Sequence, residues 1–316
     1  MDESHPSLRE ATILFGDLRG FSGIAASYPP ELVFGLLNDC FIRLSEIAAR
    51  HHGTIDKFIG DAIMVVFSGN DACEDARHGV HCAVDMQIAM DEAHHARRDT
   101  IRPELYMGIG VNSGQVIEGV LGSKIYSART VIGDEVNLAA RIEAFCLRGQ
   151  VLISESSYRL CSGFVETGDA MEVYVKGREQ GITLREVYGI PSEGITLPRQ
   201  ERRRSPRVQV RFPFSYQLLA NDVVSQVRAR GTVLDIGYRG VGVELERELS
   251  LFEEFKLDLE LPLIGCRATD VYGRIVNVKQ KQGRYQFGVE FTSLGAEARR
   301  NIHRLVQLLI QGTGSD

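Results

Sequence analysis

The chain has 316 residues, with 36 Lys and Arg against 42 Asp and Glu, which gives a formal net charge of −6. This length suggests two domains, and the acidic balance argues against a general nucleic-acid binder, whose domain is usually basic. No apolar run reaches the ~18–20 residues of a membrane-spanning helix, and the polar start MDESHPSLRE does not resemble a signal peptide. The six cysteines are scattered without C-x-x-C spacing, which favours a reduced, cytoplasmic protein.

The first part of the chain begins with a strand and a long helix. Residues 11–16 predict a short apolar strand. A helix is expected from about Pro30 and should end at Gly53, because glycine is favoured just after the last residue of a helix. Apolar residues recur on one stripe of this helix at helical spacing. They are Val33, Leu36, Leu37, Cys40, Phe41, Leu44, Ile47 and Ala48.

A hairpin and a second helix follow. The segments TIDKFI and AIMVVF predict two strands joined by a turn at Gly60-Asp61. A helix is then expected over roughly 73–97, followed by strands near 104–111 and 115–121. This β-α-β-β-α-β order predicts a ferredoxin-like α+β fold.

Two aspartates lie where apolar strands run into Gly-containing turns, Asp17 in ILFGDLRGFS and Asp61 in GTIDKFIGDAIMVVF. Magnesium is usually held by one or two carboxylates together with substrate phosphates, and a pair of such ions can clamp an in-line displacement. Asp also favours turns for local reasons, so the pair by itself is weak evidence for a metal site.

Further polar residues accompany these aspartates. Lys57 lies four residues before Asp61, and Asp134 opens a helix on which Asn137 and Arg141 are four apart and therefore share a face. An amide and a guanidinium aimed together suit the charge that develops on a transferring phosphoryl group. Taken singly, each residue is also compatible with an ordinary surface position.

Residues from about Ala11 to Tyr188 resemble the catalytic domain of class III nucleotidyl cyclases. The motifs FGDLRGFS, GTIDKFIGDAIMVVF, GIGVNSGQVIEGVLGS, TVIGDEVNLAAR and VYVKG carry the likeness in the family's order and spacing. The resemblance implies that Asp17 and Asp61 bind two Mg²⁺ or Mn²⁺ ions. It also implies that Lys57 and Thr130 read the purine.

The same resemblance implies roles at the ribose and the phosphates. Asn137 and Arg141 would position the ribose and stabilise the transition state at the α-phosphate, and Lys176 would meet the terminal phosphates. Backbone amides after Asp17 would help to cradle the triphosphate. These are the amides of Leu18, Arg19, Gly20 and Phe21.

The choice of base follows from donors and acceptors. Adenine offers an acceptor at N1 and a donor at N6, and guanine reverses both. Lysine can only donate, so Lys57 favours ATP and leaves the guanine N1 donor unmatched. The hydroxyl of Thr130 can donate or accept, so it does not decide. Guanylate cyclase is therefore the nearest enzymatic alternative.

The resemblance also implies a homodimer, because the family divides its site between two protomers. One protomer would supply Asp17 and Asp61, and the other the base-reading, ribose and phosphate residues. A chain that carries both halves should form a two-fold dimer with two equivalent sites.

Histidines recur in and near the second long helix. His78 and His81 are three apart, and His94 and His95 are adjacent near its end. Zinc is conceivable here, but no further ligand cluster accompanies them in the sequence. We therefore interpret them as solvated histidines.

After Tyr188 the composition changes. The segment GIPSEGITLPRQ has no helical period and is interpreted as a linker. A basic cluster and an alternating strand around 208–216 follow, then further strand patterns, and an amphipathic helix closes the chain. The strand patterns lie at about 227–234, 241–245, 255–260, 271–278 and 285–291. Short strands at this spacing predict a small β-barrel.

Residues of about 200–294 resemble the PilZ family, which binds cyclic di-GMP. RRRSPR fits the family's RxxxR through Arg203 and Arg207, and DIGYRG fits its DxSxxG through Asp235 and Gly240. Two arginines can clamp phosphates by bidentate hydrogen bonds, and a carboxylate can accept from the guanine N1 and N2 donors. Gly237 stands where the family has serine, which removes a hydroxyl from this loop.

Together these patterns predict a cyclase domain over 8–190, a linker over 191–200 and a PilZ-like barrel over 201–312. The expected function is adenylate cyclase, regulated by cyclic di-GMP. A cyclase-shaped scaffold that binds cyclic di-GMP without catalysis is the competing explanation.

Overall fold

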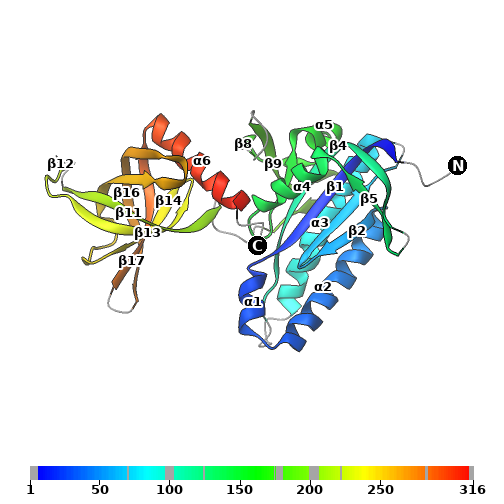
Figure 1. Cartoon of the computed structure of the whole chain (residues 1–316), viewed down its shortest axis with the longest axis horizontal. Helices are drawn as coiled ribbons and strands as arrows, with labels where there is room; N and C mark the ends of the chain where they lie inside the picture. Colours follow the sequence, from blue (N-terminus) through cyan, green and yellow to red (C-terminus); the bar gives the residue numbers. More distant parts are fainter. Residues whose placement is uncertain are drawn as a thin grey trace. The chain divides into compact units, whose positions relative to one another are not determined.

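The computed structural model describes residues 6–69, 71–96, 103–123, 125–173, 175, 181–198, 206–220, 223–281 and 284–312. The chain separates into two compact units that divide at about residue 202 (Figure 1). Each unit has its own sheet.

The first unit is built on a sheet with the order β10-β9-β6-β4-β1-β3-β2, to which β5, β7 and β8 are added. Its strands are β1 (Ser7–Arg19), β2 (Thr54–Ile59), β3 (Ala62–Phe67), β4 (Tyr106–Gly122), β5 (Ser127–Ile132), β6 (Val151–Ser154), β7 (Glu166–Thr167), β8 (Met171–Val173), β9 (Ile182–Ile190) and β10 (Ile195–Thr196). Its helices are α1 (Phe21–Ser27), α2 (Pro30–Arg50), α3 (Ala72–Ala96), α4 (Asp134–Ala144), α5 (Glu155–Cys161) and the short 3-10 helix η1 (Pro191–Glu193).

The central strand β1 is buried on both faces. It pairs antiparallel with β3 on one side and β4 on the other. Leu14 and Leu18 pack with α2 and α3 in one core cluster, whereas Ile13 and Phe15 pack with α4 in a second cluster. Alternate strand residues point to opposite faces of the sheet, so helices on both faces hold β1 in place. This arrangement confirms the predicted α+β cyclase-type fold.

Most predicted elements of this unit lie within a few residues of their observed bounds, but two expected strands are one. The patterns at 104–111 and 115–121 belong to the continuous strand β4. The intervening Asn112 and Ser113 are buried, and both have partners. Asn112 donates to the Glu135 carboxylate at 2.7 Å, and the Ser113 hydroxyl lies 2.7 Å from that of Thr12. The strand therefore continues through its polar centre.

The segment after β9 carries more structure than a linker. Pro191–Glu193 forms η1, and β10 pairs with the end of β9 through Ile195↔Ile190 and Thr196↔Gly189. Ile195 and Leu197 pack against the main core. The predicted domain limits of 8–190, 191–200 and 201–312 stay a prediction.

The second unit is a closed barrel of six strands with a C-terminal helix, as predicted. The strands follow the order β11-β13-β14-β17-β16-β15, and pairing of β11 with β15 closes the ring. Its elements are β11 (Arg207–Ala220), β12 (Val223–Val224), β13 (Ala229–Gly237), β14 (Gly240–Leu245), β15 (Glu254–Leu261), the 3-10 helix η2 (Pro262–Ile264), β16 (Cys266–Lys281), β17 (Arg284–Leu294) and α6 (Ala296–Gly312). Buried Ile302, Leu305 and Val306 form the apolar face of α6. Among the helices described, none is long and apolar enough to cross a membrane.

Candidate active site

The two predicted metal-binding aspartates lie side by side at one end of the sheet. Asp17 is opposite Ala62 in the β1–β3 register, and Asp61 directly precedes Ala62 in the β2–β3 turn. Gly60 makes this turn possible because its φ of +62° is in the left-handed region, which side chains other than glycine rarely adopt. The hairpin therefore brings the Asp61 carboxylate beside Asp17.

The electrostatics of this pair suit a divalent cation. Burial raises the pKa of Asp17 to about 6, Arg19 lowers it, and the neighbouring charge of Asp61 raises it. Burial also raises the pKa of Asp61. A cation between the carboxylates would relieve the cost of burying their charges, and two carboxylates are the oxygen ligands that Mg²⁺ and Mn²⁺ accept.

An arginine links this pair to α4. The Arg19 Nη1 lies 3.4 Å from the Asp17 Oδ2, and its other terminal nitrogen donates to the carboxylate and the backbone carbonyl of Glu143. Burial raises the pKa of Glu143 to about 7, although Arg19 opposes the shift. From the sequence, only the backbone amide of Arg19 could be assigned to the site. Glu143 could not be identified, because no motif distinguishes it from other helix-surface acids.

The segment predicted to cradle phosphates turns sharply after Arg19. Leu18 is buried in β1, and its backbone N–H lowers the pKa of the adjacent Asp17 carboxyl. Gly20 has a φ of +77° and precedes α1, whose first helical bonds run from Gly23 and Ile24 to the Gly20 carbonyl. The N–H of Phe21 therefore lies ahead of the first helical bond. The cradle role of Leu18, Arg19, Gly20 and Phe21 stays a prediction.

The predicted purine-reading residues meet in a second cluster. The Lys57 ammonium donates to the Thr130 hydroxyl at 3.1 Å, and that hydroxyl donates to the Asp56 carboxylate at 2.9 Å. The Lys57 Nζ also lies 3.1 Å from the same Asp56 oxygen. Asp56 has a side chain only 4% exposed. Asp56 could not be identified from the sequence, because an acidic strand residue next to Lys57 has the pattern of an ordinary surface charge.

The predicted ribose residues lie on α4. Asn137 is exposed and Arg141 is half-buried, and the helix packs tightly on β4 because a Cβ at Gly110 would collide with the backbone of Glu143. Among the residues that the structure describes, no hydrogen bond or ion pair joins Asn137 or Arg141 to Asp17 or Asp61. Lys176 lies outside the described residues.

In the second unit, three of the four predicted ligand residues come together. The Arg207 Nη1 donates to the Asp235 Oδ1 at 2.9 Å. A Cβ at Gly240 would lie 3.0 Å from the Arg207 Nη2, and one at Gly237 would lie 2.8 Å from its Cγ. The glycine at 237 thus lets Arg207 lie close to β13. Arg203 lies outside the described residues.

Comparisons with known proteins agree with this geometry. Residues 3–186 match the family model of the adenylate and guanylate cyclase catalytic domain, and residues 201–308 match that of the PilZ domain. Adenylate cyclase of Anabaena cylindrica is 36% identical over 191 residues, which cover 57% of this chain and 37% of that protein. The chain thus matches little more than a third of that relative's length.

Two solved structures are similar to the first unit. Adenylyl cyclase CyaB from P. aeruginosa is 31% identical with a TM-score of 0.55, over 58% of this chain and 95% of that chain. Guanylyl cyclase Cya2 is 34% identical with a TM-score of 0.58, over 61% of this chain and 98% of that chain. Overall likeness therefore does not choose between the two purine bases.

Proposed function

Because the chain belongs to the adenylate and guanylate cyclase catalytic-domain family, and also carries a PilZ domain, we propose that it converts ATP to 3′,5′-cyclic AMP and pyrophosphate. The observation that carries the proposal is the position of Asp61 next to Asp17 at the sheet end, where Asp17 lies opposite Ala62, together with the Lys57–Thr130 contact. Both clusters consist of the residues that match the family's motifs.

The Asp56 carboxylate supports adenine as the base. An ionised carboxylate only accepts hydrogen bonds, and a hydroxyl has one proton and two lone pairs. The proton of Thr130 is directed to Asp56, and one lone pair accepts from Lys57. The remaining lone pair can accept only, so it matches the N6 amino group of adenine and not O6 of guanine.

Lys57 completes the pattern. Its ammonium has three N–H donors, of which one points to Thr130 and one to Asp56. The third remains for an acceptor such as N1 of adenine. The cluster thus offers one donor and one acceptor, which is the complement of the adenine edge. Guanylate cyclase is the alternative, because guanylyl cyclase Cya2 is at least as similar in fold, with a TM-score of 0.58 against 0.55 for adenylyl cyclase CyaB.

The proposed active unit is a homodimer. Within one chain, Asp17 contacts Arg19, which also binds Glu143, and Asp61 lies beside Asp17. Lys57 and Thr130 instead contact Asp56. We propose that the second set, with Asn137, Arg141 and Lys176, faces the aspartates of the partner. Apolar side chains exposed along β4, β5 and their connection supply a surface that association would bury. They are Ile117, Val120, Leu121, Ile125, Tyr126 and Ile132.

In this arrangement each residue has a physical task. Asp17 and Asp61 would hold Mg²⁺ or Mn²⁺, and bound metal would stabilise negative charge on the reacting oxygens. Arg141 would stabilise charge at the α-phosphate, and Asn137 would hold the ribose so that its 3′-hydroxyl is in line. Arg19 keeps the Asp17 carboxylate oriented.

Product analysis tests the proposal. The purified chain is incubated with ATP or GTP and Mg²⁺ or Mn²⁺, and the cyclic nucleotide is identified by mass spectrometry. Cyclic AMP as the preferred product supports the proposal, and cyclic GMP as the preferred product would replace it with the alternative. No product from either, in a protein that dimerises, would favour a non-catalytic scaffold.

We further propose that cyclic di-GMP binding to the PilZ domain regulates the cyclase. Arg207 and Asp235 are the groups in contact, and together with Arg203 and Gly240 they would bind the phosphates and the guanine edge. Typical couplings of ~1–3 kcal/mol change activity about 5–150-fold. Cyclase rate is measured across a cyclic di-GMP titration that is paired with direct binding. An unchanged cyclase rate in protein that binds cyclic di-GMP would refute the proposed regulation. Absence of binding would refute the proposal that cyclic di-GMP is the ligand.

A further inference from the structure

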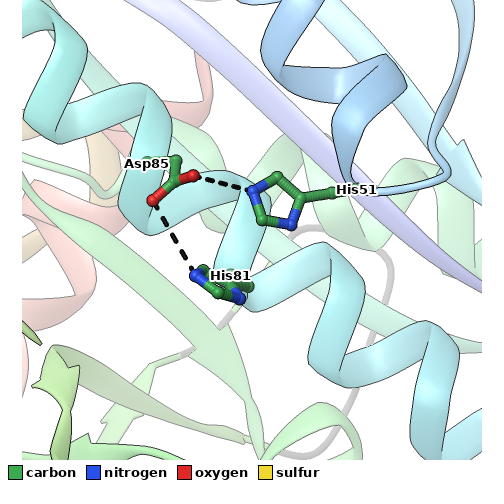
Figure 2. A group of neighbouring side chains, drawn as sticks. All are labelled: His51, His81 and Asp85. Carbon is green, nitrogen blue, oxygen red and sulfur yellow. Dashed lines mark hydrogen bonds and ion pairs between the residues drawn. The ribbon is translucent and has the colours of Figure 1, made fainter. Parts of the chain in front are cut away.

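A cluster of metal-ligating side chains lies in the first unit, apart from the aspartate pair. His51 follows the last residue of α2, and His81 and Asp85 are one turn apart on α3 (Figure 2). The His51 Nε2 lies 2.8 Å from one Asp85 oxygen, and the His81 Nε2 lies 3.8 Å from the other. One ligand atom from each residue lies within 4.8 Å of the others. In a tetrahedral site with bonds of about 2.0–2.1 Å the ligand atoms lie roughly 3.3–3.4 Å apart, so small side-chain rotations would bring these three atoms onto one ion.

The surroundings favour a cation at this point. The carboxyl end of α2 carries a partial negative charge, and His51 lies at that end. The three side chains are between 12% and 23% exposed, which leaves an ion access from solvent.

A fourth ligand is in reach. The Glu193 carboxylate in η1 lies 3.2 Å from the His81 Nε2, and its side chain is 40% exposed, so it can rotate toward the other ligands. Imidazoles bind metals in their neutral form, so a bound set of two imidazoles and two carboxylates carries a charge of −2, which a divalent ion cancels. The set is therefore chemically complete.

We propose that His51, His81, Asp85 and Glu193 bind one Zn²⁺ ion at a site separate from the catalytic metals. Two nitrogen ligands suit zinc, whereas Mg²⁺ prefers an all-oxygen octahedron. The site replaces the interpretation of His81 as a solvated histidine. His78 does not belong to it, since its ring faces that of His52 with 4.9 Å between ring centroids.

The competing explanation is a hydrogen-bonded His–Asp–His network without an ion. The His51–Asp85 contact has the length of an ordinary hydrogen bond. The two explanations can be distinguished by metal content, because only the metal site requires one bound Zn²⁺ per chain.

The test uses the full chain with Asp17→Asn and Asp61→Asn, which silences the catalytic metal position. After treatment with chelator, the protein is titrated with Zn²⁺ against a competing chromophoric chelator in excess Mg²⁺. Co²⁺ is titrated in parallel for the visible bands of tetrahedral cobalt. His81→Gln is the test variant, and His78→Gln is the matched control on the same helix.

We expect one Zn²⁺ per chain, retained in His78→Gln. In His81→Gln the affinity should fall at least ~100-fold, because loss of an outer-shell partner alone costs 10–100-fold. In Glu193→Gln it should fall less, because water can take the position. Zinc should also raise the melting temperature of the parent protein but not of His81→Gln.

Failure of the parent protein to bind zinc would overturn the proposal, as would equal affinity in His81→Gln and His78→Gln. If His81→Gln does not fold, Asp85→Asn takes its place in the same titration. This outcome is independent of catalysis, because the catalytic aspartates are absent throughout.

Discussion

The role of Asp56 in base selection is open to a direct test. Replacing Asp56 with Leu keeps the branched shape of the side chain but removes the carboxylate oxygen that contacts both the Thr130 hydroxyl and Lys57. The Thr130 proton then has no fixed acceptor, so the hydroxyl can donate to O6 of guanine. Asp56→Asn is the matched control, because its amide oxygen can still accept from Thr130.

The magnitude follows from one changed hydrogen-bond match. A buried polar group left without its partner costs about 1–3 kcal/mol, and 1.36 kcal/mol corresponds to a tenfold change. The ratio of kcat/KM for ATP to that for GTP should therefore fall about 5–150-fold in Asp56→Leu. In Asp56→Asn it should change by less, although both rates fall because Lys57 loses its charged partner.

Steady-state kinetics with both nucleotides, at saturating metal, give this ratio for each variant. Size-exclusion chromatography and urea unfolding establish that the variants fold and associate. An unchanged ratio in a folded Asp56→Leu dimer would refute the assignment of Thr130 as a fixed acceptor. An equal loss in Asp56→Asn would show that the carboxylate charge, and not its acceptor oxygen, governs the choice.

Three further predictions concern the shared site, the aspartate pair and the barrel. Asp61→Ala and Arg141→Ala, each inactive alone, should recover about a quarter of wild-type activity when mixed in equal amounts, because half of the dimers would then hold one intact site; no recovery after proven subunit exchange would contradict the dimer. Asp17→Asn should stabilise the metal-free protein by up to about 3 kcal/mol at pH 7.5 but not at pH 3.5, because the raised pKa of about 6 in the folded state makes the free energy of unfolding of the wild type fall as pH rises from 3.8 through 6. Urea unfolding at both pH values checks the sign, and an equal effect at both would exclude this cause. Arg207→Ala should weaken cyclic di-GMP binding about 10–150-fold, the loss of a charge-assisted hydrogen bond of ~1.5–3 kcal/mol; calorimetry measures this, and unchanged affinity would place the ligand elsewhere than beside Asp235.

The fold could be predicted largely because its signals are local. The α2 stripe from Val33 to Ala48 has helical spacing, and its residues Leu36, Leu44 and Ile47 are buried as expected. The sequence predicted two strands with a break at Asn112 and Ser113, because these residues are polar and the partners that allow their burial, Glu135 and Thr12, are distant in sequence. No period in the sequence indicates such pairing.

The candidate site shows the same division. Asp17, Asp61, Lys57 and Thr130 could be assigned from motifs that stay together along the chain. The groups that orient them could not, since the Arg19–Glu143 contact spans 124 residues and the Thr130–Asp56 contact spans 74. Such supporting residues depend on how β1 meets α4 and on how β2 meets β5, which only the folded chain determines.

The short strand β10 bears on where the catalytic portion can be cut from the chain. It continues the pairing of β9, and the Leu197 N–H donates to the Tyr188 carbonyl at 2.8 Å. A fragment that stopped at Ile190 would lose these bonds and would uncover core surface beneath Ile195 and Leu197. Such a truncation should aggregate more readily, because exposed strand backbone and apolar surface promote association. A fragment that retains residue 198 keeps β10 paired with β9.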